Sequence, residues 1–233
     1  MKIIARIYTE FDEKFGIPRQ SGIVSETVGR IVFEPEYRNP EAFRGIDGYS
    51  HLWLIWQFSE AVRDTWSPTV RPPRLGGNKR MGVFATRSPF RPNPIGLSSV
   101  KLIGVEKTEQ EGIVLLVSGA DILSGTPIYD VKPYLAYTDS HPDAIGGFAD
   151  EVMGYKIDVE FAEGVAENLS ESEREKLIAI LSEDPRPSYK SDDERSYGMK
   201  LEGKEITFKY LNGKLVVTNY LISKTIDEPI NKN

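Results

Sequence analysis

Short apolar segments follow one another through the first 141 residues, and no amphipathic helical pattern separates them. They are rich in Val, Ile and aromatic residues and are bounded by Gly, Pro, Asn and Asp, which is typical of β-strands between turns. The pattern predicts strands at Lys2–Thr9, Ile23–Phe33 (one or two), Ser50–Phe58, Met81–Thr86, Ile95–Val105, Gly112–Ser118 and Thr126–Val131. The run SHLWLIWQF, with Trp53 and Trp56, predicts a strand that is buried on both faces. This spacing favours a barrel or a sandwich.

The pattern changes after DSHPDAIGG (Asp139–Gly147), where a linker is expected. Ser170 and Glu173 form a capping box ahead of EREKLIAILSE, so a helix is expected there. Its predicted apolar face consists of Leu177, Ile178 and Leu181. A meander should follow, with Asn212-Gly213 as a hairpin turn and strands at Gly198–Leu201, Glu205–Leu211 and Lys214–Ile222. The sequence therefore predicts a mainly β protein, with a small β domain over residues 1–141 and a smaller α+β domain over residues 150–233.

Composition excludes several kinds of chemistry. The chain has no cysteine, so disulfides, iron–sulfur clusters, thiolate zinc sites and a cysteine nucleophile are excluded. No apolar run approaches the roughly 18 residues that a membrane span needs. The start, MKIIARIYTEFDEKFG, carries acids where a secretion signal has an apolar core. We therefore expect a cytoplasmic protein that does not bind membranes.

The segment Arg63–Lys101 has an unusual charge and an unusual backbone. It holds eight of the 29 Lys and Arg residues but one acid, so its net charge is +7 while the rest of the chain carries −13. It also holds six of the 15 prolines and four glycines, which stiffen the backbone into turns. Such a loop indicates a binding site for an anionic ligand, whether a phosphate, a carboxylate or RNA. The alternative is a proline-rich surface excursion with incidental charge.

Known catalytic motifs are absent. Neither G-x-G-x-x-G after a strand nor G-x-x-x-x-G-K-[ST] occurs, so a Rossmann or P-loop nucleotide site is not expected. His51 and His141 have no second histidine at ligand spacing, so no metal site is expected. His51 heads an apolar strand, where a hydrogen-bonded core histidine is the alternative to a site residue. The residues alone thus predict a basic pocket on a β scaffold, without naming its reaction.

Several long strings resemble one known family. FGIPRQSG, FRGIDGYSHLWLIW, PTVRPPRLGGNKRMGVFATRSPFRPNPIGLS and DILSGTPIYDVKPY are similar, in order, to the TsaA-like (TrmO) family, and they cover most of residues 1–141. The later string DPRPSYKSDDERSYG resembles the C-terminal domain of the bacterial members. Only YTEF, at the end of the first strand, departs from the family pattern.

The resemblance implies both a fold and an activity. Members of the family are S-adenosylmethionine-dependent tRNA methyltransferases that methylate N6 of threonylcarbamoyladenosine at position 37, in the anticodon loop. Their fold is a small β-barrel that is not a Rossmann sheet, and they pair as homodimers with the cofactor site near the interface. By motif, the implied cofactor-binding residues are Pro18, Arg19, Gln20, His51, Leu52, Arg87, Leu97, Asp130, Val131, Lys132 and Pro133.

The chemistry of the methyl donor suggests roles within this set. A guanidinium suits its carboxylate, which makes Arg19 or Arg87 a candidate. Asp130 could hold the amino group or the ribose hydroxyls, and Leu97 with Pro133 could sandwich the adenine. Without the resemblance, a solvated turn pair is the alternative for Asp130 and Lys132, and ordinary barrel core is the alternative for Leu97. The candidates for a general base are Asp121, Asp130 and His51.

The RNA would meet the basic segment. The residues expected near anticodon-loop phosphates are Arg71, Arg74, Lys79, Arg80 and Arg91. Stacking on the target base is expected from Tyr129, Phe90 or Trp66, for each of which a packing role is the alternative. The C-terminal domain is expected to add RNA contacts or to position the partner subunit, with polar candidates Arg186, Tyr189 and Arg195 and with surface turn residues as the alternative.

Two other classes of function remain open. One is a non-catalytic RNA-binding module whose pocket holds no cofactor. The other is a hydrolase that uses Asp47, Asp121 and Asp130 around a metal ion.

Overall fold

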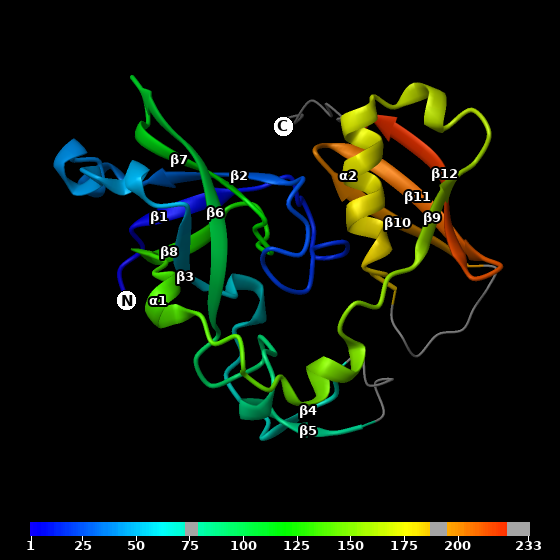
Figure 1. Ribbon diagram of the computed structural model, residues 1–233, viewed down its shortest axis with the longest axis horizontal. Helices are drawn as coiled ribbons and strands as arrows, with labels where there is room; N and C mark the ends of the chain where they lie inside the picture. Colours follow the sequence, from blue (N-terminus) through cyan, green and yellow to red (C-terminus); the bar gives the residue numbers. More distant parts are fainter. Residues whose placement is uncertain (73–78, 187–194, 223–233) are drawn as a thin grey trace, which may run out of the picture.

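The first 133 residues hold the strands of a closed barrel. The computed structural model describes residues 1–72, 79–186 and 195–222. Six strands join in the order β1-β2-β7-β6-β3-β8, and every neighbouring pair is antiparallel (Figure 1). They are β1 (Ala5–Tyr8), β2 (Val28–Phe33), β3 (His51–Gln57), β6 (Ile95–Thr108), β7 (Gly112–Ser118) and β8 (Thr126–Pro133). Because the sheet closes on itself, the backbone N–H and C=O groups of every strand face a neighbouring strand, and the barrel has no free edge.

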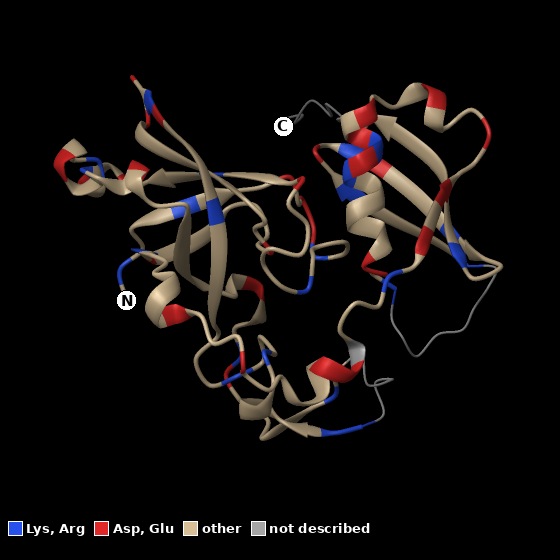
Figure 2. Cartoon of the chain, in the orientation of Figure 1, with Lys and Arg blue, Asp and Glu red and all other residues tan. Residues whose placement is uncertain are grey.

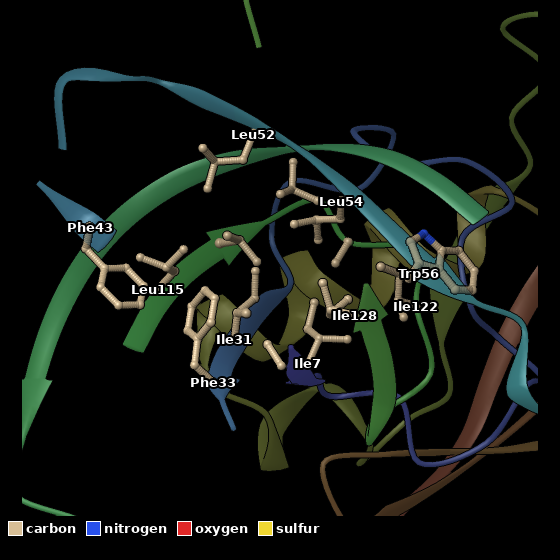
Figure 3. Packing of buried hydrophobic residues seen from close by; sticks show 14 residues of the cluster. Ile7, Ile31, Phe33, Phe43, Leu52, Leu54, Trp56, Leu115, Ile122 and Ile128 are labelled. Atoms are coloured by element: carbon tan, nitrogen blue, oxygen red, sulfur yellow. The ribbon is translucent and has the colours of Figure 1, made fainter. Parts of the chain in front are cut away.

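The barrel core follows from strict alternation along the strands. Leu52, Leu54 and Trp56 of β3 are buried, whereas the residues between them are half-buried. Figure 3 shows these side chains pointing inward against residues of the other strands, among them Ile7 and Ile128. The prediction that this strand is buried on both faces is wrong, because its outward-facing residues are only half-buried.

The excursion between β3 and β6 is built from local turns. The predicted strand Met81–Thr86 is wrong: β5 (Met81–Gly82) is two residues long, pairs with β4 (Thr69–Val70), and leads into the 3₁₀ helix η6 (Val83–Ala85). Prolines on both sides of this segment lack a backbone N–H, so a long hydrogen-bonded ladder is not available to it. Another 3₁₀ helix, η4 (Ser59–Ala61), begins the excursion.

The 3₁₀ helices between β2 and β3 are η1 (Pro35–Tyr37), η2 (Pro40–Phe43) and η3 (Ile46–Gly48).

After β8 the chain forms α1 (Ala136–Asp139), which ends at Asp139, the residue where the linker was expected to begin. Asp139 Oδ2 accepts hydrogen bonds from Trp53 Nε1 and from the backbone N–H of Leu135, both at 2.9 Å. These bonds hold α1 against the outer face of β3.

The second unit is a four-stranded sheet with one helix. Its strand order is β10-β11-β12-β9, and the structure adds β9, parallel to β12, which sequence reasoning missed. Its elements are η7 (Gly147–Val152), β9 (Asp158–Phe161), η8 (Ala166–Asn168), α2 (Glu171–Ser182), β10 (Ser196–Leu201), β11 (Lys204–Leu211) and β12 (Lys214–Ile222). Helix α2 buries Leu177, Ile180 and Leu181; Ile178, predicted for the apolar face, is 40% exposed. Among the described residues no helix is long and apolar enough to cross a membrane.

The two units share a core. Phe11 and Val24, from the connection between β1 and β2, are buried in the hydrophobic cluster of the second unit. Phe11 also forms a β-bridge with Leu201 of β10. In Figure 1 this connection, coloured dark blue, extends from the barrel toward α2. The division at residues 1–141 and 150–233 therefore omits a segment of the first unit that packs with the second.

The N-terminus of α2 has a pH-sensitive anchor. The Glu173 carboxylate accepts hydrogen bonds from Lys204 Nζ (2.5 Å), Tyr220 Oη (2.7 Å) and Ser170 Oγ (2.7 Å). The Lys204 ammonium and the Ser170 bonds lower the pKa of Glu173 well below its usual range. A carboxyl group with a depressed pKa stabilises the fold above the pKa of the unfolded chain, and this stabilisation is lost as the pH falls.

We expect Glu173→Gln to lower the free energy of unfolding at pH 7, and the difference from the unsubstituted protein to shrink as the pH falls below about 4.5, where the unfolded carboxyl takes up a proton. Urea unfolding at pH 7, 5 and 3.5 measures this. Glu175→Gln, at an exposed position of the same helix, is the control. A difference that is constant over this pH range contradicts the assignment.

Candidate cofactor and RNA site

The outward side chains of β6, β3 and β8 form rows across the surface of the barrel. Strand pairing places Leu97 of β6 and Asp130 of β8 on either side of Ile55 of β3. Lys132 follows in the next row, beside Trp53. Neighbouring strands lie about 4.8 Å apart, so Leu97 and Asp130 are roughly 10 Å from each other. Three of the predicted cofactor residues thus share one surface.

This surface has an apolar side and a charged side. The Leu97 side chain is 58% exposed, so the alternative of ordinary barrel core is wrong for it. Asp130 Oδ2 lies 2.8 Å from Lys132 Nζ, and this hydrogen bond raises the pKa of Lys132. Both members of the pair are accessible to solvent. An apolar contact and a polar pair at this separation suit a ligand with an adenine at one end and hydrogen-bonding groups beyond it.

The connection between β1 and β2 brings two more predicted residues to the edge of β6. Ser21 Oγ accepts a hydrogen bond from the backbone N–H of Ser99 at 3.2 Å, and the Gly22 N–H donates to the Gly119 carbonyl at 2.8 Å. Gln20 Oε1 accepts from Arg87 Nη1. Because Ser99 lies two residues from Leu97 on β6, the contact at Ser21 brings the chain after Gln20 to this part of β6.

Arg19 is turned toward the C-terminal domain. Its Nη2 donates to the carbonyl oxygen of Asp184 at 3.2 Å, just beyond the end of α2. Arg87, by contrast, is exposed and contacts Gln20.

His51 and Pro133 lie at the other end of the rows. His51 pairs with Lys101 of β6, roughly 13 Å along the strand from Leu97. The His51 Nδ1 atom lies 2.9 Å from Ser50 Oγ, and its ring is 6.2 Å from that of Tyr134. The ring is half-buried on the outer side of β3, so a core histidine, the alternative left open by the sequence, is wrong.

Three predicted cofactor residues point elsewhere. Leu52 is fully buried in the barrel core, and Val131 packs against the same core from β8. Their side chains face inward because each lies one residue out of phase with the outward positions of its strand. Pro18 is buried ahead of Arg19. Any contact of Leu52 or Val131 with a ligand on the outer face would therefore come from backbone atoms.

Asp121 lies behind this surface, not on it. Ser98 Oγ donates to Asp121 Oδ1 at 2.6 Å and accepts from Trp56 Nε1 at 2.9 Å. Burial raises the pKa of the Asp121 carboxyl, and the Ser98 bond and the charge of Arg87 act in the opposite direction. Sequence reasoning missed Ser98 and Ser21. Ser98 could have been found from its position next to Leu97, because neighbouring residues of a strand face opposite sides and Ser98 therefore faces inward.

The basic excursion presents several of the predicted RNA-binding residues to solvent. Arg71, Lys79 and Arg80 are exposed, and Figure 2 shows basic segments at the β4–β5 ribbon. Arg74 lies outside the described residues. Arg91 Nη1 donates to the carbonyl of Thr86 at 3.1 Å, so this side chain also holds the turn together.

Exposed aromatic rings accompany these charges. Trp66 is 52% exposed and its ring lies 6.0 Å from Phe84, which is 73% exposed and was missed by sequence reasoning. The Arg63 guanidinium lies 3.9 Å from the ring centroid of Phe90. Tyr129 Oη donates to Gln57 Oε1 at 2.5 Å. Rings and guanidinium groups together are typical of surfaces that bind unstacked bases.

The polar candidates of the C-terminal domain have structural contacts. Arg186 binds both carboxylate oxygens of Asp184, at 2.7 and 2.9 Å, and lies 3.7 Å over the ring of Tyr210. Its side chain is 11% exposed, so Arg186 braces the turn after α2. Arg195 lies 5.5 Å over the Tyr197 ring. Tyr189 lies outside the described residues.

A cavity of about 630 Å³ lies near the far half of β6, lined by Phe43, Asp47 and Tyr49, among other residues. None of the predicted cofactor residues lines it. Asp47, Asp121 and Asp130 belong to different surroundings. In the parts of the chain that the structure describes, no group of three or more His, Cys, Asp or Glu side chains could hold a metal ion.

Comparison with known proteins identifies the family. Residues 6–140 match the model of the tRNA-methyltransferase O N-terminal domain, and residues 154–221 match that of the TrmO C-terminal domain. The tRNA (adenine(37)-N6)-methyltransferase of Escherichia coli (strain K12) is 40% identical over 197 residues, which are 82% of this chain and 83% of that protein.

The chain belongs to the TrmO family.

Other relatives of the family agree in sequence and in fold. A Pseudomonas aeruginosa protein named as an inferred S-adenosylmethionine-dependent methyltransferase is 38% identical over 221 residues, 91% of this chain and 93% of that protein. The crystal structure of TrmO from Pseudomonas aeruginosa superposes with a TM-score of 0.75 at 33% identity, and the match covers 94% of this chain and 96% of that one. The resemblance in the sequence and the predicted fold class are thereby confirmed.

Proposed function

We propose that this TrmO-family protein methylates N6 of threonylcarbamoyladenosine at position 37 of tRNA. It is an S-adenosylmethionine-dependent tRNA (adenine(37)-N6)-methyltransferase, the activity named for its Escherichia coli relative. One observation carries the proposal. Arg87, at the end of the basic excursion, contacts Gln20 beside the exposed face of β6, so the surface suited to RNA and the surface suited to the cofactor are continuous.

The residues of the outer face fit the methyl donor. The Arg87 guanidinium, beside Gln20, would hold its carboxylate. Leu97 offers an exposed apolar contact for the adenine, and Asp130 would accept hydrogen bonds from ribose hydroxyls or from the amino group. When bound, S-adenosylmethionine supplies a methyl group that its sulfonium has already activated. The protein then has to orient the acceptor nitrogen, and orientation alone can contribute about 7–11 kcal/mol.

The acceptor N6 loses a proton, and Asp130 is the best placed of the three base candidates. It lies on the outer face, is accessible, and forms an ion pair with Lys132 at 2.8 Å. Asp121 is buried and committed to Ser98, so it would orient Ser98 and act on Arg87 by its charge. His51 lies at the far end of the rows.

The protein would act as a homodimer. Ile95, Leu97, Ile103 and Val105 of β6 are exposed hydrophobic residues on one long strand, which a monomer leaves in contact with water. A partner that covers this face would also close the cofactor site and exclude water from it. Sedimentation of the protein at micromolar concentration tests this; a monomer would contradict it. We also propose a cytoplasmic location.

RNA binding should depend on salt through the basic excursion. We expect Arg80→Ala to weaken tRNA binding about fivefold at 0.1 M salt and to reduce the slope of log K against log salt by about 1, because one phosphate contact is lost. Fluorescence anisotropy over a range of salt concentrations measures both. Lys107→Ala removes an equal charge at an exposed position of the β6–β7 hairpin and should change neither quantity. Equal effects of the two substitutions would contradict the assignment.

The activity itself is tested by incubation with labelled S-adenosylmethionine and threonylcarbamoylated tRNA, followed by nucleoside mass analysis. We expect the modified adenosine to gain one methyl group. A protein that binds tRNA but releases no heat on cofactor titration would be an RNA-binding module. The hydrolase would be indicated by a product that carries no label and that no longer forms when a chelator is added.

A further inference from the structure

The segment that leads to the cofactor residues is packed into the C-terminal domain. Phe15 lies between the two units, and its ring stacks on Tyr197 at 6.4 Å and on Phe208 at 6.2 Å, with interplanar angles of 12° and 6°. Phe11 is fully buried in the same cluster, and Val24 enters it from the other end of the segment. Four residues after Phe15 comes Arg19, the first polar residue of the predicted cofactor site.

Polar contacts fix the same segment to the turn between β10 and β11. Glu13 Oε1 accepts from the backbone N–H of Lys200, and Asp12 Oδ2 accepts from that of Gly203, both at 2.9 Å. The Glu10 carbonyl accepts from the Glu202 N–H at 2.9 Å. These bonds use backbone donors of the C-terminal sheet, so they define the position of the segment and not only its burial.

A buried ion pair adds to this attachment. Lys176 Nζ of α2 lies 2.9 Å from Glu10 Oε1 and 3.1 Å from Glu202 Oε1, and the Lys176 side chain is 13% exposed. At its far end the segment is held once more by the C-terminal domain, through the bond from Arg19 Nη2 to the Asp184 carbonyl. Contacts of the second unit therefore begin at Glu10 and continue to Arg19.

The segment needs such support. It spans the chain from the end of β1 at Tyr8 to the start of β2 at Val28 and contains no helix or strand. Connections of this length without secondary structure are uncommon in compact domains, and their ordering costs conformational entropy. The first unit touches the segment at the Phe11 carbonyl, which accepts from the Ser124 N–H at 3.0 Å, at Lys14, which pairs with Glu60 at 3.0 Å, and at Ser21 and Gly22. The buried side chains Phe11 and Val24 of the segment pack in the cluster of the C-terminal domain, so their burial comes from that domain.

We infer that the C-terminal domain is a positioning element for the cofactor site, which it preorganises by holding residues 10–19. This inference rests on the proposed function, because it takes Arg19 and Gln20 as cofactor residues. When only a fraction of the protein is in the binding-competent conformation, the apparent affinity equals the intrinsic affinity multiplied by that fraction. Contacts of Phe15 far from the ligand then set the affinity for the methyl donor.

The charge of the C-terminal domain agrees with a role other than RNA binding. Residues 150–233 contain 18 acids and 12 Lys or Arg residues, a net charge of −6. Figure 2 shows acidic segments along α2 and β9. Phosphate backbones are bound by clustered positive charge, so this domain does not supply the main electrostatic attraction for tRNA.

The test compares two phenylalanines in the full chain. Phe15 and Phe161 are both half-buried and pack against the same cluster, but Phe15 lies on the β10 side of the sheet and Phe161 is in β9, at the opposite edge. Both alanine variants should lower the melting temperature. We expect Phe15→Ala alone to raise the KM and the Kd for S-adenosylmethionine about tenfold with kcat nearly unchanged, and Phe15→Leu to restore most of the affinity.

Amide hydrogen exchange without cofactor gives a second readout. Residues 12–22 should exchange faster in Phe15→Ala than in Phe161→Ala at equal loss of melting temperature. Equal exchange, or equal changes of KM, would overturn the inference. If the unsubstituted protein binds no S-adenosylmethionine, the proposed function fails instead, and exchange still reports whether the C-terminal domain orders the segment.

Discussion

Replacing Arg87 with alanine is expected to reduce methylation to background while the protein stays folded. Arg87 donates to Gln20 Oε1 and is the cationic side chain that acts on buried Asp121. The substitution removes a charge-assisted hydrogen bond to the cofactor carboxylate, worth about 1.5–3 kcal/mol, which corresponds to a loss of affinity of roughly 10- to 150-fold. Because the side chain is exposed, the free energy of unfolding should change little.

Two variants control this experiment. Arg87→Lys keeps the charge without the planar fork, so its activity should lie between those of the unsubstituted protein and Arg87→Ala. Arg44→Ala removes an arginine whose side chain is 78% exposed and bound to Glu41, and it should leave affinity unchanged. Cofactor titration by calorimetry and methylation rates measure the outcome. Full activity of a folded Arg87→Ala protein would refute the site.

Replacing Gly96 with alanine is expected to cause the largest loss of stability, about 3 kcal/mol. Gly96 of β6 pairs with Trp56 of β3, and a Cβ at position 96 would lie 2.2 Å from Cε2 of the indole ring. Trp56 is buried in the barrel core, where overpacking forces side chains and backbone to shift. A displaced ring also loses the bond from its Nε1 to Ser98, and Ser98 holds Asp121 behind the cofactor surface.

Urea unfolding and cofactor affinity together measure this effect. Gly48→Ala is the control, because a Cβ there would meet no atom within 4 Å. Trp56→Phe combined with Gly96→Ala should be more stable than Gly96→Ala alone, since the smaller ring leaves room for the methyl group. A Gly96→Ala protein as stable as the unsubstituted one would show that the close contact is not maintained in solution.

The strands of the barrel could be predicted because their patterns are local. The apolar run SHLWLIWQF locates β3 within one residue at each end, and Asn212-Gly213 marks the hairpin between β11 and β12. The errors occur where a local pattern has two interpretations. Trp53 was taken as buried because its neighbours are apolar, yet it faces outward and bonds to Asp139. β9 alternates over only four residues, Asp158–Phe161, which is too short a run to stand out between turns, so it was missed.

The site could be predicted in part. Exposed Leu97 and the Asp130–Lys132 pair were named from motifs, and the structure places them on one surface. Leu52 and Val131 come from the same motifs but point into the core. Motif resemblance identifies a stretch of chain; the register of the strand decides which of its side chains reach the ligand.

By itself the sequence determined the class of the fold, the family, and the charge of the excursion, because periodicity, motif strings and composition are properties of neighbouring residues. Only the tertiary structure decided which residues meet. The Arg87–Gln20 contact joins positions 67 apart, and Arg19 reaches Asp184 across 165 residues. Such contacts depend on how the barrel closes and on how the Glu10–Arg19 segment packs into the second sheet. No local pattern encodes them, since their free energy comes from burial that exists only in the assembled fold.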